Sequence, residues 1–319
     1  GYQLDLSMRM FEFHEVGTLL LALLALVGLV DGVGALVRRT LLSASPLPGR
    51  LRRAGGFAAS AAVFCLIGAA AAFLSGPIAE ALSPEGLARL GRFAAGAWPP
   101  AHEAAFVAET GRAVLETLSI AVVGTALGAA IGGALAAFAT YNHAVDPPLV
   151  ASRRGAGMRL AYHASRWLLN ALRAVPEVFF ALILVLAVGL GPFAGSLALG
   201  LHTGGILGKL YADTLESADA RAFGALVAAG AGAWPAALYS TLPASLPILL
   251  SHTLFRWEMN IRAAAVLGLV GGGGLGQALY NAVQLGFYDQ LFTLVLLLWA
   301  LVTGVDAASA RLRSRLGAA

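Results

Sequence analysis

Long uncharged stretches constrain this chain more than any other feature of its sequence. Each spans about 20 residues, the length that an α-helix needs to cross the hydrocarbon core of a membrane. Hydrophobic residues make up 59% of the sequence and charged residues 12%, whereas soluble domains average roughly 45–50% and about 25%. A soluble core cannot absorb that surplus, so the sequence predicts an all-α polytopic membrane protein. The clearest stretches are Gly17–Val37 (interrupted by Asp31), Ala54–Ala79, Thr117–Tyr141, Val178–Gly208, Ala263–Tyr288 and Gln290–Val305.

The basic residues flank these stretches and therefore predict a topology. Arginines cluster within residues 38–53, 153–166 and 311–315, and the positive-inside rule assigns such clusters to the cytoplasm. The segment Ser75–Arg112 mixes glutamates with arginines and is expected to be an external, periplasmic loop. The net charge is +4, but the basic residues form no single patch, so the sequence predicts no nucleic-acid partner. We expect a multi-pass protein of the bacterial cytoplasmic (inner) membrane, in contact with membrane lipid.

The charged loops order the later stretches alternately across the membrane. We expect Trp167–Leu190 to run outward as one helix, and the run GLGPFAG (Gly189–Gly195) to break the helix at its proline and form a tight outer turn. Asp213–Leu242 then lies in the cytoplasm, and Pro243–Val270 forms the next outward helix. The glycines of Gly271–Gly274 permit a close turn at the outer face. They do not predict a phosphate loop, because no strand precedes them and the Lys-Ser/Thr pair is missing.

Three segments carry a resemblance to a known family. They are RAVPEVFFALILVLAVGLGPFAGSLALGLHTGGILGKL (Arg173–Leu210), YSTLP (Tyr239–Pro243) and FRWEMNIRAAAVLGLVGGGGLG (Phe255–Gly276). Together they resemble the phosphonate-uptake permeases of the ABC importer family, in register from about Leu115 to Leu316. The resemblance implies the helical bundle of a type I ABC importer permease. It also implies the transmembrane permease subunit of an ATP-driven ABC importer for phosphonate or a related phosphorus oxyanion.

The same resemblance implies a set of partners. A pair of cytoplasmic ABC ATPase subunits is expected to hydrolyse ATP, and a periplasmic solute-binding protein to deliver the solute. A second permease copy, fused or homodimeric, is expected to complete the pathway. The chain itself is then a transport subunit rather than an enzyme, with no catalytic residue, no cofactor and no bound metal.

The first hydrophobic segment resembles the last one, which suggests a tandem organisation. Thr18–Arg39 aligns with Thr293–Ser314 without a gap. We expect residues 1–45 to be the last transmembrane helix of a preceding permease repeat. Residues 46–112 are then an extra transmembrane helix with a periplasmic loop, and residues 113–319 a permease core. The most informative matches are Asp31 with Asp306 and Arg38 with Arg313.

The family's coupling segment is a short cytoplasmic helix pair that fits a groove in the ATPase. It starts with Glu-Ala-Ala, continues to a glycine that permits the turn between the helices, and ends at a Leu-Pro, where proline is tolerated in the first turn of the next helix. The aromatic residues here are candidate knobs for the ATPase groove, or they pack as an ordinary amphipathic surface. Within residues 213–242, the resemblance and the aromatic pattern select Gly230, Trp234, Tyr239, Leu242 and Pro243.

One position departs from the family's coupling pattern. The motif's Glu corresponds to Gly224, and its two alanines to Ala225 and Leu226. Coupling that relies on that carboxylate is therefore absent here. Either the partner groove has changed, or this copy is the weaker half of a fused pair.

A polar cluster interrupts the expected helix that begins at Pro243. Ionisable residues inside a membrane are costly and persist where they pair or line a water-filled path. Glu258 and Arg262 are four residues apart and suit an ion pair, while Arg256 shares a face with Asn260. The cluster either holds helices together or attracts a passing oxyanion along a translocation path.

His202 and Thr203 lie in an otherwise apolar stretch, GLHTGG. A single histidine in such a place is an interhelical hydrogen-bonding residue or, alternatively, part of the translocation path. His202 and Thr203 are therefore candidate residues of the translocation path.

Other functions remain open from the sequence alone. A related ABC permease for phosphite, phosphate or methionine would differ mainly in its binding protein. A secondary transporter would show inverted repeats, whereas the repeat here is direct. A membrane enzyme would need converging His, Cys or carboxylate side chains, which the expected spans lack.

Overall fold

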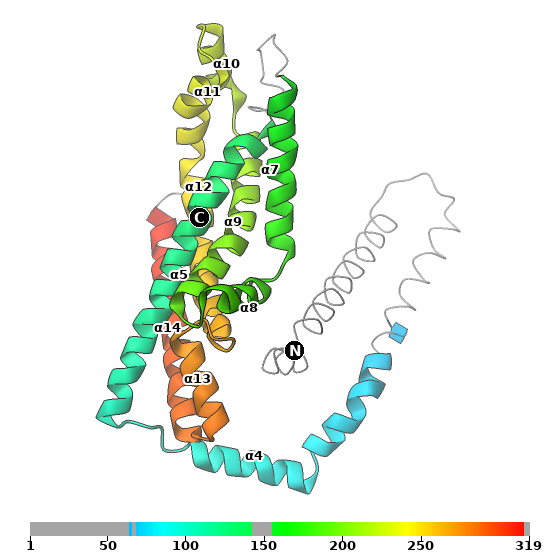
Figure 1. Ribbon diagram of the computed structural model, residues 1–319, viewed down its shortest axis with the longest axis vertical. Helices are drawn as coiled ribbons and strands as arrows, with labels where there is room; N and C mark the ends of the chain where they lie inside the picture. Colours follow the sequence, from blue (N-terminus) through cyan, green and yellow to red (C-terminus); the bar gives the residue numbers. More distant parts are fainter. Residues whose placement is uncertain (1–63, 66–67, 142–154, 316–319) are drawn as a thin grey trace. The chain divides into compact units, whose positions relative to one another are not determined.

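The computed structural model describes residues 64–65, 68–141 and 155–315 (Figure 1). The expected N-terminal helix within residues 1–45, and the first part of segment 46–112, lie outside the described residues. All regular secondary structure in the described ranges is helical, which confirms the all-α prediction. The chain divides into two compact units, Gly1–Arg92 and Phe93–Ala319.

The segment that we expected to be an external loop is largely helical. Residues 68–81 form a helix, and α4 follows at Pro84–Ala97. The start of α4 carries the signals of a helix N-terminus, since Ser83 Oγ accepts a hydrogen bond from the Gly86 N–H at 3.1 Å and proline occupies the first position. The segment is therefore mostly helical rather than irregular, and its periplasmic location stays a prediction.

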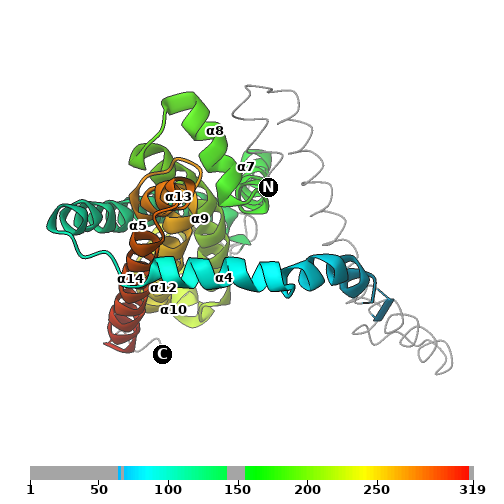
Figure 2. The same cartoon turned by 90° about the horizontal axis from the view of Figure 1, so that it is seen from below.

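In the second unit the central contact joins α5 (Ala104–Ala139) and α9 (Pro192–Ser217). Glycines follow α5 at intervals of four residues and allow the two backbones to approach closely. A Cβ atom added to Gly132 would lie only 2.6 Å from the Gly208 nitrogen. The end-on view in Figure 2 shows α9 between α5 and α7. The small residues of the sequence thus decide the closest helix pair of the bundle.

The expected span Trp167–Leu190 is not one straight helix, and its crossing of the membrane stays a prediction. Two helices occupy it, α7 (Ala156–Ala174) and α8 (Glu177–Val188), and they meet at an angle of 89°. The break falls at Val175–Pro176, because a residue before proline is driven out of the helical region and proline cannot donate to the preceding turn. The next predicted turn is confirmed, since Gly189 and Gly191 have φ of 93° and 132° and α9 begins directly after them.

The remaining helices complete the bundle. Together α12 and α13 confirm the predicted helix after residue 242 and the glycine turn after it. In Figure 1, α10 and α11 lie at one end of the unit and α13 lies near the other end. The elements are α10 (Ala220–Ala228), α11 (Ala233–Ala236), a π-helical turn (Ala237–Thr241), α12 (Leu242–Gly268), α13 (Gly274–Leu285) and α14 (Tyr288–Arg315).

Two of the described helices, α5 and α14, are each long and apolar enough to cross a membrane, and the bent pair α7 and α8 passes the same test together. Many large apolar side chains remain exposed, including Trp299 at 68% and Phe193 at 67%. Exposed apolar surface of this extent is expected for helices that face lipid or another subunit.

Candidate functional site

The segment between α9 and α12 folds into a pair of short helices (Figure 1). Asp219 caps α10 by accepting a hydrogen bond from the Arg221 backbone N–H at 2.9 Å, and hydrogen bonds from Arg221 lower the pKa of the Asp219 carboxyl. Gly230 has a φ of 93°, a conformation that favours glycine. Phe223 packs with alanines of α11 and the π turn into a small apolar core. The predicted turn at Gly230 is confirmed, while its role in coupling stays a prediction.

The other expected coupling residues differ in how available they are for a partner. Trp234 is 37% exposed, and its ring lies 6.0 Å from that of Phe138, edge to face. Tyr239 is 76% exposed, so it is the more available of the two aromatic rings. Pro243 lies in the first turn of α12, after Leu242, as predicted. Gly224, where the family has a glutamate, is buried within α10.

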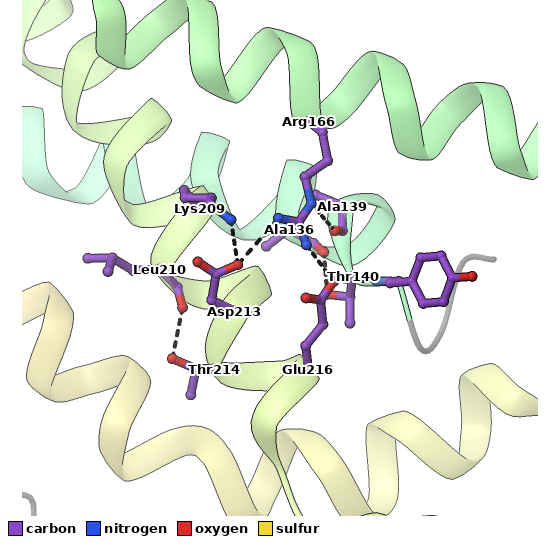
Figure 3. Close-up of polar contacts among 10 residues, drawn as sticks. Ala136, Ala139, Thr140, Arg166, Lys209, Leu210, Asp213, Thr214 and Glu216 are labelled. Atoms are coloured by element: carbon purple, nitrogen blue, oxygen red, sulfur yellow. Dashed lines mark hydrogen bonds and ion pairs between the residues drawn. The ribbon is translucent and has the colours of Figure 1, made fainter. Parts of the chain in front are cut away.

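A cluster of charges joins three helices just before this helix pair (Figure 3). Arg166 of α7 donates from Nε to the Ala139 carbonyl oxygen of α5 at 2.8 Å. Its Nη2 lies 2.5 Å from Glu216 Oε1, and its Nη1 lies 3.3 Å from Asp213 Oδ1, both on α9. Glu216 also accepts a hydrogen bond from the Tyr141 N–H at 2.6 Å. We call Arg166, Asp213 and Glu216 the Arg166 clamp.

This clamp was not predicted from the sequence. Arg166 was grouped with the loop arginines, whereas the residue lies inside α7. Its guanidinium also lies 5.4 Å from the centre of the Tyr162 ring. The available signal was the spacing of Lys209 and Asp213, four residues apart and paired at 2.7 Å. That spacing marks Asp213 as part of a charged helix face, and tertiary packing adds the arginine.

The predicted pair of Glu258 and Arg262 is confirmed and belongs to a larger network. The two side chains lie 3.2 Å apart. Glu258 is only 9% exposed and also pairs with Arg313 of α14 at 3.1 Å. Arg262 reaches Asp306 of α14 at 2.7 Å. The network therefore fixes α12 against α14.

Asn260 and Thr203 link helices through hydrogen bonds. Asn260 has no exposed surface. Its Nδ2 donates to Thr125 Oγ1 of α5 at 2.8 Å, and its Oδ1 accepts from Thr203 Oγ1 of α9 at 3.1 Å. Thr203 is equally inaccessible. In this conformation both residues hold α5, α9 and α12 together and do not line an open path.

His202 of α9 lies at the break between α7 and α8. Its Nδ1 is 2.9 Å from the Val175 carbonyl oxygen, and its Nε2 is 3.3 Å from Glu177 Oε2. Arg256 of α12 is near enough to Glu177 to interact with its charge. The Nε atom of Arg256 is buried and makes no hydrogen bond with any of the described residues. The interhelical hydrogen bond expected of the histidine is thus present, and an incompletely satisfied arginine lies in the same electrostatic environment.

The glycine turn after α12 borders a cavity of about 860 Å³. Gly273 and Gly274 have φ of 83° and 70°, and Thr117 Oγ1 of α5 accepts a hydrogen bond from the Leu275 N–H at 2.8 Å. The charged side chains that line the cavity are Glu109, Arg112 and Glu116. Across the described part of the chain, no three His, Cys, Asp or Glu side chains converge as metal ligands would.

Comparison with known proteins places these features in context. Residues 149–318 match the family described as binding-protein-dependent transport system inner membrane component. The phosphite transport system permease protein PtxC of Stutzerimonas stutzeri is 37% identical over 202 residues, which cover 63% of this chain and 69% of that protein. The putative phosphite transport system permease protein HtxC of the same organism is 34% identical over 228 residues, covering 72% and 76%.

A solved structure supports the fold. The MetNI methionine ABC transporter in an inward facing conformation has a chain that superposes with a TM-score of 0.58 at 22% sequence identity. The match covers 67% of the present chain and 99% of that chain. The arrangement of helices described above is therefore that of a type I ABC importer permease.

Proposed function

This chain belongs to the family of binding-protein-dependent transport system inner membrane components, and from that premise we propose that it conducts a small phosphorus oxyanion across the inner membrane. It is a multi-pass permease subunit of an ABC importer and a transport subunit rather than an enzyme. A separate pair of ATPase subunits hydrolyses ATP, a periplasmic solute-binding protein delivers the solute, and a second permease copy completes the pathway.

The observation that carries the coupling part of this proposal is the helix pair α10 and α11. It is a compact projection with its own apolar core, and it leaves Tyr239 largely exposed. The Arg166 clamp lies directly before it and ties the middle of α7 to the C-terminal ends of α5 and α9. A force applied to the pair by an ATPase would therefore reach three core helices.

The solute class rests on the named relatives. PtxC and HtxC are phosphite transport system permease proteins by name, and phosphite, phosphonates and phosphate share a tetrahedral anionic phosphorus group. The sequence identity with the MetNI chain is too low for a solute to be inferred from it. Methionine therefore serves as the control solute in the uptake experiment below.

A crosslinking experiment tests the coupling role. The exposed native Cys65 is first replaced by serine, and a cysteine is placed at Tyr239. We expect it to crosslink to the ATPase subunit in the assembled transporter. A cysteine at Trp299, which is also largely exposed but lies on the long α14, serves as the matched control and should not react. A Tyr239 cysteine that never reaches the ATPase while the transporter hydrolyses ATP would contradict the docking role.

An uptake experiment tests the solute. The transporter is reconstituted in liposomes with its ATPase and binding protein, and uptake of phosphite, methylphosphonate, phosphate and methionine is compared. ATP-dependent accumulation of at least one phosphorus oxyanion, and none of methionine, is expected. The reverse preference would overturn the proposed solute class.

A further inference from the structure

Glu177 and His202 meet where α7 ends and α8 begins, and Arg256 is close enough to interact with the charge of Glu177. Glu177 lies in the first turn of α8, His202 comes from α9 and Arg256 from α12. The His202 side chain is 12% exposed and that of Glu177 is 31% exposed. The group is thus mostly enclosed by protein and still reachable at the carboxylate.

The contacts of His202 determine how its protons are arranged. The Val175 carbonyl oxygen can only accept a hydrogen bond, so the facing Nδ1 atom carries a hydrogen. The other nitrogen, Nε2, faces a carboxylate oxygen of Glu177, which also accepts. That second contact is favourable only when a proton lies between the two groups. The Glu177 carboxylate therefore accepts a hydrogen bond from His202 whenever Nε2 carries a hydrogen.

Arg256 adds a positive charge that no carboxylate of the group contacts directly, and the charge of Glu177 acts on it only from beyond ion-pair distance. A guanidinium stays protonated in proteins, and among the described residues none forms an ion pair with Arg256 at 4.0 Å or less. Its one hydrogen bond, from Nη2 to Asn260 Oδ1, is long at 3.5 Å, and that oxygen already accepts from Thr203. A charge with an unsatisfied buried donor is costly inside a protein.

The neighbouring arginines show that this chain can satisfy such a charge. Arg262 has two carboxylate partners, and Arg313 pairs with Glu258 and donates to Ser309. The lack of a carboxylate in direct contact with Arg256 is thus a property of this one position rather than of α12 as a whole.

We propose that Arg256 and His202 form a binding site for a singly charged phosphorus oxyanion on its way through the bundle, with Glu177 as the counter-ion of the empty site. The oxygens of such an anion accept from the unsatisfied guanidinium and from the protonated Nε2 of His202, in the place of the Glu177 carboxylate. This inference rests on the proposed function, because it assigns the solute to residues within this chain.

Direct binding to the full-length chain tests the site without the partner subunits. The protein is purified in a phosphorus-free maltoside detergent, and the ³¹P resonance of phosphite is followed as protein is added. We expect broadening that saturates for the unmodified chain. For R256Q the apparent dissociation constant should rise at least about tenfold, since a charge-assisted hydrogen bond is worth about that much. R173Q removes an exposed arginine near the same break and should bind phosphite as the unmodified chain does.

A second variant covers the case in which R256Q does not fold. E177Q removes the competing carboxylate and should tighten phosphite binding, whereas a merely structural Glu177 would give unchanged or weaker binding and overturn the proposal. Equal binding by R256Q and the unmodified chain would also overturn it. Short-chain phosphatidylglycerol is added as a competitor, and displacement of phosphite by the lipid but not by methylphosphonate would assign the site to lipid headgroups instead.

These outcomes separate the site from the proposed function. If the reconstituted transporter imports no phosphorus oxyanion, the proposed function fails whatever the variants do. If the unmodified protein and R256Q import phosphite equally, the function stands and the site is wrong.

Discussion

Arg166 and Arg256 lie in neighbouring parts of one bundle and meet opposite circumstances. Arg166 has a carbonyl oxygen, two carboxylates and an aromatic ring around its guanidinium. Arg256 has one long hydrogen bond and a buried Nε without any. An arginine whose donors all have partners stabilises the fold. An arginine with unsatisfied donors can still bind an anion. The comparison predicts that the first sets stability and the second sets transport.

Breaking the Arg166 clamp should have the largest effect on stability. R166Q removes the cation that Asp213 and Glu216 share near the end of α9, so Glu216 loses its ion pair with Arg166 while Asp213 keeps Lys209. Losing one partner of a buried ion pair costs about 3–5 kcal/mol, and we expect about 2–3 kcal/mol here because the arginine side chain is 19% exposed. The free energy of unfolding is measured by titration with a denaturing detergent.

The matched control for the clamp is R221Q. Arg221 also pairs with an aspartate, at 2.6 Å, but its side chain is 91% exposed, so no measurable loss is expected. If R166Q were as stable as R221Q, the clamp would not hold α7 to the ends of α5 and α9.

Removing the carboxylate at the centre of the network between α12 and α14 should have an intermediate effect. In E258Q, Arg262 keeps Asp306 and Arg313 keeps Ser309, so neither arginine is stranded. We expect a loss of about 1–2 kcal/mol in the free energy of unfolding. The double variant E258Q/D306N strands Arg262 and should lose clearly more. Equal stability of the single and double variants would refute the shared network.

Changing Arg256 should have the smallest effect on stability. R256Q removes a charge that has no carboxylate in direct contact, together with one long hydrogen bond. The free energy of unfolding should therefore stay within about 0.5 kcal/mol of the unmodified value. ATP-dependent uptake of phosphite by the same preparation should nevertheless fall. A stability loss as large as that of R166Q would erase the contrast between the two arginines.

Helical periodicity, turn residues and local spacing were enough to predict much of the fold. The helix that follows residue 242, the turn at Gly230 and the glycine break after Gly189 all follow from properties of single residues or short runs. The pair of Glu258 and Arg262 followed from a spacing of four on one helix. These predictions succeeded because each depends on neighbours in the sequence.

The clamp and the bend between α7 and α8 were missed for different reasons. The bend had a local signal, since Pro176 disfavours the helical conformation in Val175. The long apolar run nevertheless predicted one continuous span. The clamp had almost none, because Arg166 meets carboxylates about 50 residues further along the chain. The internal repeat gave an indirect hint of the second network, since the matched Asp306 and Arg313 are the residues of α14 that pair with α12.

The sequence by itself determined that this chain is a helical membrane protein and which family it resembles. It also determined most of the turns between the described helices. These properties depend on apolar runs, glycines and prolines, whose effects act over a few residues. Only the tertiary structure decided which arginines are satisfied. The cost of a buried charge depends on the atoms that surround it, and helices distant in the sequence bring those atoms together. Glu258 thereby became a structural carboxylate, and Arg256 was left with a charge that a passing anion can balance.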